Sequence, residues 1–264
     1  MEEFPLHRHY LHYSELPYSQ RVLYTAVLLV LGSAYIFALL QINFTYAGRA
    51  GGNGKVASYQ DIVVGYSGNK NGSVLETALR GPMAKMISSD DRQAIFAWLE
   101  DGSPREAYDK SIKPILDNDC MTCHDGSNPH RPNLSTYDDI KKMTAVDTGP
   151  TVATLVRVSH IHLFGLTFIF FIVGLMFSHA YVRPVWLKCV IVAAPFAAII
   201  VDVSSWYIIR HFHPFAFVEI LAGMTMAGCF AYMWLVTMYQ MWFSEPPEAV
   251  TVRDVERGVL LHDR

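Results

Sequence analysis

The residues of this chain with the clearest chemistry stand together in the run Cys120-Met121-Thr122-Cys123-His124. Two residues between the cysteines let both thiols attach covalently to the vinyl groups of one haem, and the next histidine then ligates the iron. A C-x-x-C pair alone is also found in redox dithiols and in half of a zinc site. The sequence has no second C-x-x-C and no βαβ pattern. The run therefore predicts one covalent haem c with His124 as its proximal ligand.

A second group of residues that could do chemistry lies at the ends of long apolar stretches. It consists of His160, His162, Asp202, His211, His213 and Glu219. Ionisable groups within a bilayer are costly and are by default functional candidates. Three interpretations stay open: a b-type haem held between two of the histidines, a quinol oxidation site whose carboxylate or imidazole accepts protons, or interfacial packing. The first two are compatible with each other.

Helical spacing gives an expectation for one of these histidines. His160 begins a heptad-like series that continues with Thr167, Gly174 and Ser178. Small and polar residues mark the packing faces of helices in membranes. The series therefore predicts that His160 faces the neighbouring helices.

Four long apolar stretches must position these residues, and they span 22–40, 158–182, 185–209 and 214–243. Each is about long enough to cross a bilayer. A signal peptide would have a shorter apolar region, a more basic start and a small-residue cleavage site. The first stretch is preceded by Glu2, Glu3 and Glu15. We therefore expect it to be an uncleaved first transmembrane helix.

The composition agrees with a membrane protein. Hydrophobic residues make up 52% of the 264 residues and charged residues only 17%, which is apolar for a soluble protein. The net charge of −3 gives no reason to expect a nucleic-acid partner. The two remaining cysteines, Cys189 and Cys229, lie in apolar stretches and are expected to be buried free thiols.

The basic residues predict the orientation in the membrane. Arg183 and Lys188 lie in the short connection between the second and third stretches, and Arg253, Arg257 and Arg264 follow the fourth. The positive-inside rule places both regions, and with four spans both termini, in the cytoplasm. Residues 48–157 then lie outside, on the oxidising side where haem c is attached. The two arguments agree on a multi-pass protein of the bacterial inner membrane with its haem domain in the periplasm.

The external segment is expected to be helical. Ser88-Ser89-Asp90-Asp91 is a helix start signal, Asp101-Gly102 is a stop, and a second helix runs from about Ala107 into the haem motif. The fold class is therefore all-α: four transmembrane helices with a small helical cytochrome c domain inserted between the first and second. The predicted domains are 1–47 (N-terminal segment and first helix), 48–157 (cytochrome c domain), 158–243 (helices two to four) and 244–264 (cytoplasmic tail).

The segment 72–136 resembles a small monohaem cytochrome c domain of the class I type. Residues 110–116 before the haem motif are similar to the entry helix of that family. Residues 81–86 and 88–102 are similar to its methionine-ligand loop and closing helix. In the family that half follows the haem motif, whereas here it precedes it, so the domain resembles a permuted one. The residues of the membrane part do not by themselves indicate a family.

The resemblance implies a methionine sulfur as the sixth ligand of the iron. Met83 and Met86 stand in the matching loop, and Met143 is the candidate in the more familiar chain order. A histidine is the further alternative. A thioether ligand raises the reduction potential of the iron relative to a second imidazole, which suits an acceptor of electrons from quinol-level donors.

These observations favour an electron-transfer subunit of a respiratory or other energy-converting complex. Electrons would pass between the quinone pool or a partner's cofactor and a periplasmic electron carrier, with other membrane subunits and membrane lipid as neighbours. The alternative is an enzyme, a quinol dehydrogenase with its own intramembrane quinol or haem b site. A sensor is disfavoured, because the tail 244–264 is too short for a signalling domain.

Overall fold

The computed structural model of the chain describes residues 12–52, 54–129 and 131–244, and no strand occurs within these ranges. The chain divides into two compact units. The first holds the described residues up to Ala38 with Leu155–Trp206 and those from Phe217 onward. The second holds Leu39–Thr154 and Tyr207–Ala216. The basic residues Arg253, Arg257 and Arg264, which contribute to the predicted orientation, lie outside the described residues.

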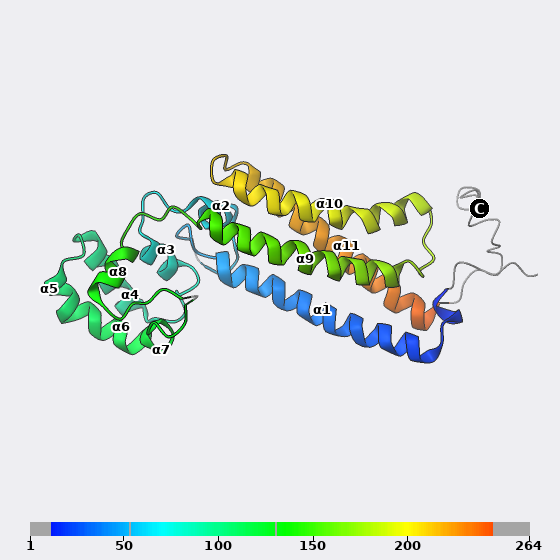
Figure 1. The fold of residues 1–264 in the computed structure, drawn as a ribbon, viewed down its shortest axis with the longest axis horizontal. Coiled ribbons are helices and arrows are strands. Elements are labelled where there is room, and N and C mark those ends of the chain that lie inside the picture. The colour runs from blue at the N-terminus through cyan, green and yellow to red at the C-terminus, as the bar shows by residue number, and fades with distance from the viewer. Residues whose placement is uncertain (1–11, 53, 130, 245–264) are drawn as a thin grey trace, which may run out of the picture. The chain divides into compact units, whose positions relative to one another are not determined.

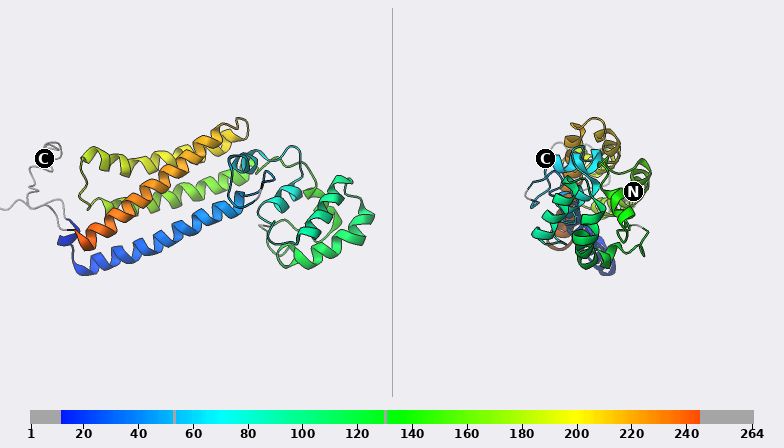
Figure 2. Two further views of the ribbon diagram at one scale, coloured as in Figure 1. Left: turned by 180° about the vertical axis from the view of Figure 1, so that it is seen from behind. Right: turned by 90° about the vertical axis from the view of Figure 1, so that its left-hand side faces the viewer.

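Four long apolar helices confirm the predicted transmembrane helices. They are α1 (Tyr18–Tyr46), α9 (Val152–Phe177), α10 (Val185–Ile209) and α11 (Phe215–Phe243). Each is long and apolar enough to cross a membrane. Their apolar lengths run alongside one another in two opposite views (Figures 1 and 2). The all-α class with four candidate membrane spans is therefore confirmed.

The second of these helices begins earlier than the predicted start at 158 and ends before the predicted 182. Thr151 explains the start, because its hydroxyl oxygen accepts the backbone N–H of Thr154 at 3.2 Å, as an N-cap does. Helix α9 ends at Phe177, where the backbone tightens into a turn in which Ala180 N–H donates to the Phe177 carbonyl at 2.8 Å.

Packing between α1 and α11 rests on specific contacts. The indole N–H of Trp234 donates to the Leu28 carbonyl at 2.7 Å. A Cβ at Gly32 would lie 2.9 Å from that indole nitrogen, so only glycine leaves room for the contact. One turn further, the rings of Tyr35 and Phe230 stack with centroids 4.3 Å apart. These contacts fix the register of α1 against α11.

Large apolar side chains stay exposed along the long helices, as expected of surfaces that face lipid. Leu28 is the buried residue of α1, whereas Val30 and Phe37 are 68% and 70% exposed. Such a surface would be costly in water, since each exposed apolar side chain forgoes roughly 1.5–3 kcal/mol of burial free energy. The exposure therefore agrees with a membrane environment.

The second unit consists of short helices between α1 and α9. They are α2 (Tyr59–Ser67), α3 (Val74–Arg80), α4 (Ser89–Glu100), α5 (Arg105–Ala107), η2 (Tyr108–Ile112), α6 (Lys113–Asp119), α7 (Met121–His124) and α8 (Tyr137–Met143), while a 3-10 turn, η1 (Tyr13–Glu15), precedes α1. The helix predicted between 88 and 101 is confirmed as α4. Ser88 accepts the Asp91 N–H at 3.1 Å as its N-cap, and Gly102 follows at φ +82°.

One apolar cluster holds α3, α4, α6 and α8 together. Its buried members are Leu75, Leu79, Ile95, Trp98, Tyr108, Ile112, Leu116, Leu134 and Ile140. The two ends of this helical segment are joined by backbone hydrogen bonds from Val74 to Ala145 at 3.0 Å and from Asp147 to Gly72 at 3.0 Å. Residues 72–147 therefore form a closed helical domain with its own core.

Candidate functional site

The C-x-x-C-H run folds into one helical turn. Helix α6 ends at Asp119, and the backbone N–H groups of Cys123 and His124 both donate to the Cys120 carbonyl, at 3.1 and 2.9 Å. Both cysteines are free thiols; Cys120 is half-buried and Cys123 exposed. This single turn therefore presents two thiols and one imidazole from the five consecutive residues of the motif.

His124 is oriented by a backbone carbonyl further along the chain. Its Nδ1 lies 2.8 Å from the Pro132 oxygen. A carbonyl oxygen only accepts, so in the neutral imidazole Nδ1 carries the proton and Nε2 keeps its lone pair. The Leu134 N–H donates back to the His124 carbonyl at 2.9 Å, which ties the loop to the turn. The histidine is thus prepared to ligate a metal through Nε2, as metal-binding histidines usually are.

The environment of Cys120 is unlike that of an activated thiol. Burial raises the pKa of its thiol, and the neighbouring Asp119 carboxylate raises that pKa further. A reactive cysteine of a thiol–disulfide enzyme has the opposite property, a lowered pKa. Cys120 is therefore a largely neutral thiol near pH 7.

The three methionines suggested as sixth ligands are not equivalent. Met83 is partly buried and packs against the apolar cluster of residues 72–147, on which Cys120 also packs. Met143 is placed against the same cluster. Met86 instead is 68% exposed. Within the loop 81–86 the packing therefore favours Met83 over Met86, and it does not separate Met83 from Met143.

The histidines of α9 do not face as the heptad series predicted. His160 is exposed, with its ring edge-on to Phe164 at 5.5 Å, while Ser159 next to it is buried. The prediction was wrong because Ser159 occupies the buried face at this end of α9, and His160, about 100° further around the helix, therefore faces outward. His162, also exposed, packs edge-on against Trp206 at 5.1 Å.

The remaining ionisable candidates belong to α10, α11 and the turn between them. Asp202 on α10 is only 8% exposed, and Glu219 on α11 is half-buried. His211 and His213 are exposed in the turn, where the Tyr59 hydroxyl donates to the His213 carbonyl at 3.0 Å. These two histidines fall in the second compact unit, and the other four candidates fall in the first. Their pairing around a haem b stays a prediction.

Metal sites built from side chains alone are not seen in the described ranges: they contain no group of three or more His, Cys, Asp or Glu residues arranged to hold an ion. A haem site needs only one such ligand besides its thioether bonds.

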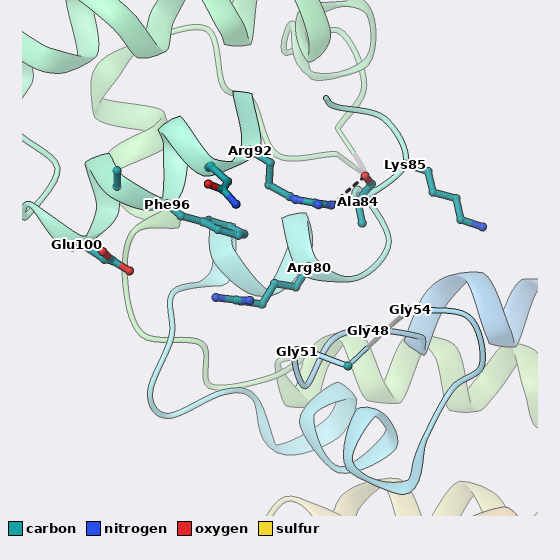
Figure 3. A pocket seen from close by; sticks show the side chains of 12 residues that line it. Gly48, Gly51, Gly54, Arg80, Ala84, Lys85, Arg92, Phe96 and Glu100 are labelled. Atoms are coloured by element: carbon teal, nitrogen blue, oxygen red, sulfur yellow. Dashed lines mark hydrogen bonds between the residues drawn. The ribbon is translucent and has the colours of Figure 1, made fainter. Parts of the chain in front are cut away.

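A cavity that sequence reasoning missed is lined by residues of the domain 72–147 and by the glycines that follow α1. Its volume is about 690 Å³, and its cationic side chains are Arg80, Lys85 and Arg92. Figure 3 shows the cavity between α4 and the glycine-rich loop that follows α1. Arg92 and Phe96 are four residues apart on one face of α4, but only folding brings Gly48, Gly51 and Gly54 to the same place.

The four long apolar helices indicate a multi-pass helical membrane protein. A family model described as a transmembrane helical domain matches residues 148–248, which include α9, α10 and α11. No curated protein and no solved structure matches the chain. The match agrees with the membrane character of these helices and covers neither the haem motif nor the cavity.

Proposed function

We propose that this protein is a membrane-anchored cytochrome c that transfers electrons through one covalent haem. The observation that carries the proposal is the 2.8 Å contact between His124 Nδ1 and the Pro132 carbonyl, beside two free thiols on the same helical turn. A redox dithiol does not require a histidine fixed in that tautomer, whereas an axial haem ligand does, because its Nε2 must hold the lone pair. A zinc site would require the same tautomer, but it would also need further ligands, and the described residues contain no group of three or more His, Cys, Asp or Glu residues arranged to hold an ion.

The residues of the chain divide the work of holding the haem. Cys120 and Cys123 would form the two thioether bonds, His124 would supply the proximal nitrogen, and Met83 would supply the sixth ligand. Bound there, haem supplies a one-electron centre whose potential follows its axial ligands and its burial. The apolar side chains around Leu116 and Leu134 would exclude water from one side of it.

The proposed placement of the domain follows from the helices that flank it. Residues 48–157 are inserted between the first and second spans as a cytochrome c domain, held at the membrane by α1 and α9. With both termini in the cytoplasm, this domain lies in the periplasm of a bacterium. There it exchanges electrons with a periplasmic carrier, while other subunits or the quinone pool deliver them from the membrane.

The proposal is tested by removing the thiols. In the Cys120→Ala, Cys123→Ala double variant of the full chain, haem staining after denaturing electrophoresis is expected to fall to background. The Cys189→Ala, Cys229→Ala double variant is the matched control and is expected to stain as the unchanged chain does, because those cysteines lie in α10 and α11. Equal staining of both double variants would sink the proposal.

A second candidate function, quinol oxidation within the membrane, is favoured by Asp202. A carboxyl group this deeply buried in a membrane helix is expensive and functional by default. Trp206 lies one turn along the same helix, and the ring of His162 packs against that indole. Oxidation of a quinol releases two protons and two electrons. Asp202 with His162 would accept the protons, and the electrons would leave one at a time, each reducing one haem.

The second function is distinguished from the first by a reduction assay. The purified full chain is mixed with a soluble quinol, and haem reduction is followed by absorbance. If the protein is a quinol dehydrogenase, reduction proceeds without a partner and slows roughly 100-fold or more in Asp202→Asn, in line with the loss of a general base. Ser204→Ala, exposed on the same helix, serves as the control. Reduction that requires a partner protein would leave only the first function.

A further inference from the structure

The cavity beside α4 gathers positive charge within one compact unit. Of the residues that line it, Arg80, Lys85 and Arg92 are cationic and Glu100 is the one anionic residue. Figure 3 shows Arg80 between the ring of Phe96 and the glycine-rich loop. All of these residues belong to the second unit, so the cavity lies within one body of the structure.

The arginines are held in place and still have donors to offer. Arg80 pairs with Glu76 at 2.8 Å, and its guanidinium lies 4.7 Å above the centre of the Phe96 ring. Arg92 donates one Nη1 hydrogen bond to the Ala84 carbonyl at 3.3 Å. Since a guanidinium has five N–H donors, each arginine retains others for a ligand. Planar guanidinium groups fixed in this way match the oxygens of a phosphate.

Glycines form the opposite wall and keep it open. Gly48 has φ +85°, and a Cβ there would lie 2.7 Å from the Arg80 carbonyl oxygen. A side chain at Gly51 or Gly52 would meet nothing within 4 Å and would project into free space. The loop therefore approaches Arg80 as closely as backbone can, and its absent side chains leave the volume for a ligand.

The cavity also adjoins the end of a membrane helix. Helix α1 ends at Tyr46, and Gly48 of the cavity wall follows almost immediately. Lys85 Nζ lies 4.9 Å above the ring of Phe44 in the last turn of α1. Phe44 and Leu40, one turn apart on the same face, are 53% and 45% exposed. A molecule with a phosphate and an acyl chain could contact the cations of the cavity with the one and the apolar end of α1 with the other.

We propose that this cavity binds the phosphate group of an anionic phospholipid whose acyl chain follows the apolar end of α1. Arg92 and Lys85 supply the charge that selects an anionic headgroup, since each cation near a membrane surface strengthens such binding about fivefold. The proposal depends on the cations and the helix end, and it stands whether or not the chain binds haem.

The test uses the purified full chain in detergent with defined lipid. Native mass spectrometry counts phosphatidylglycerol and phosphatidylcholine retained from an equimolar mixture. The unchanged chain is expected to retain phosphatidylglycerol in preference, and the Lys85→Gln, Arg92→Gln double variant is expected to lose that preference by roughly 10- to 30-fold. The control double variant, Lys70→Gln with Lys110→Gln, removes two exposed cations elsewhere on the same unit.

Three outcomes separate the sources of the phosphate. Loss of preference in the cavity variant alone, unaffected by millimolar inorganic phosphate, supports the lipid. Displacement of the lipid by inorganic phosphate, with tight phosphate binding that requires Arg92, would show a soluble anion as occupant and overturn the lipid part. If the unchanged chain and both double variants show the same preference for phosphatidylglycerol, the proposed site is wrong. Far-ultraviolet circular dichroism of each variant verifies that the helices are intact.

Discussion

At the scale of single residues, the haem motif could be predicted from sequence and its orientation could not. Cys120, Cys123 and His124 carry their chemistry in their spacing. The acceptor of the His124 proton, the Pro132 carbonyl, carries no such signal, because any residue has a carbonyl and only the loop places this one at 2.8 Å. The same holds for the methionines, whose burial depends on the packing of residues 72–147.

Met83 gives the first prediction at this scale. Replacing Met83 with His is expected to lower the midpoint potential of the haem by on the order of 0.1 V, because imidazole stabilises the oxidised iron more than a thioether does. The measurement is a spectroscopic redox titration of the purified chain. The same change at Met86, which is exposed, is expected to leave the potential within experimental error.

The same titration of a Met143→His variant can contradict the assignment. If Met143→His lowers the potential and Met83→His does not, the sixth ligand follows the familiar chain order of cytochromes c and the assignment to the loop 81–86 is wrong.

At the scale of elements, helices with strong local signals were predictable and those fixed by distant partners were not. Helix α4 follows directly from its cap and stop residues. Helix α2 has an equally clear cap, Ser58, which accepts the Asp61 N–H at 3.2 Å. Asp61 however also accepts the Ala50 N–H, at 2.8 Å, from the loop after α1. That second contact depends on the chain folding back and has no sequence pattern.

The carboxyl group of Asp61 makes the stability of this junction depend on pH. Burial would raise the pKa of its carboxyl, but hydrogen bonds from Ala50, from the backbone and side chain of Ser58 and from Gly48 together outweigh burial and lower the pKa. A lowered folded-state pKa means that the carboxylate stabilises the fold above its ordinary pKa of about 4. The stabilisation is lost as the pH falls through the lower folded value.

Asp61→Asn is therefore expected to loosen the α2 junction at pH 7. Losing hydrogen bonds to a charged acceptor costs about 2 kcal/mol, so the amides of α2 should exchange hydrogen roughly 30-fold faster. Hydrogen exchange with mass spectrometry on the full chain measures this. The difference between the unchanged and substituted chains is expected to shrink at pH 3, and a difference that grows there would contradict the assigned sign.

At the scale of the whole molecule, the length of the apolar stretches predicted the four membrane helices. It did not predict which face of each helix packs against its neighbours. In a membrane helix the residues that face lipid and those that face a neighbouring helix have similar hydropathy. The direction in which His160 points could therefore not be read from the pattern around it. The contacts that do fix the packing, such as Trp234 on the Leu28 carbonyl beside Gly32, join residues far apart in sequence. Each of the two compact units likewise combines segments that are far apart in sequence, and no local sequence pattern predicts this combination.

The orientation of the chain gives a prediction at this scale. In a Cys189→Ala, Cys229→Ala background, in which the proposed thioether bonds leave no thiol at Cys120 or Cys123, a Lys70→Cys variant is expected to react with a membrane-impermeant maleimide in spheroplasts, because residue 70 is exposed in the periplasmic domain of the proposed topology. A Tyr181→Cys variant, in the connection between α9 and α10, is expected to react only after permeabilisation. The reverse pattern would invert the topology.

The measurement that tests the central claim most directly is the attachment of haem to the unchanged chain. The purified protein is treated with acidic acetone, and the reduced-minus-oxidised spectrum of the polypeptide and of the extract is recorded. Covalent attachment through Cys120 and Cys123 predicts a c-type spectrum that stays with the polypeptide. An additional b-type band in the extract would add an intramembrane haem. A polypeptide that retains no haem would contradict the account.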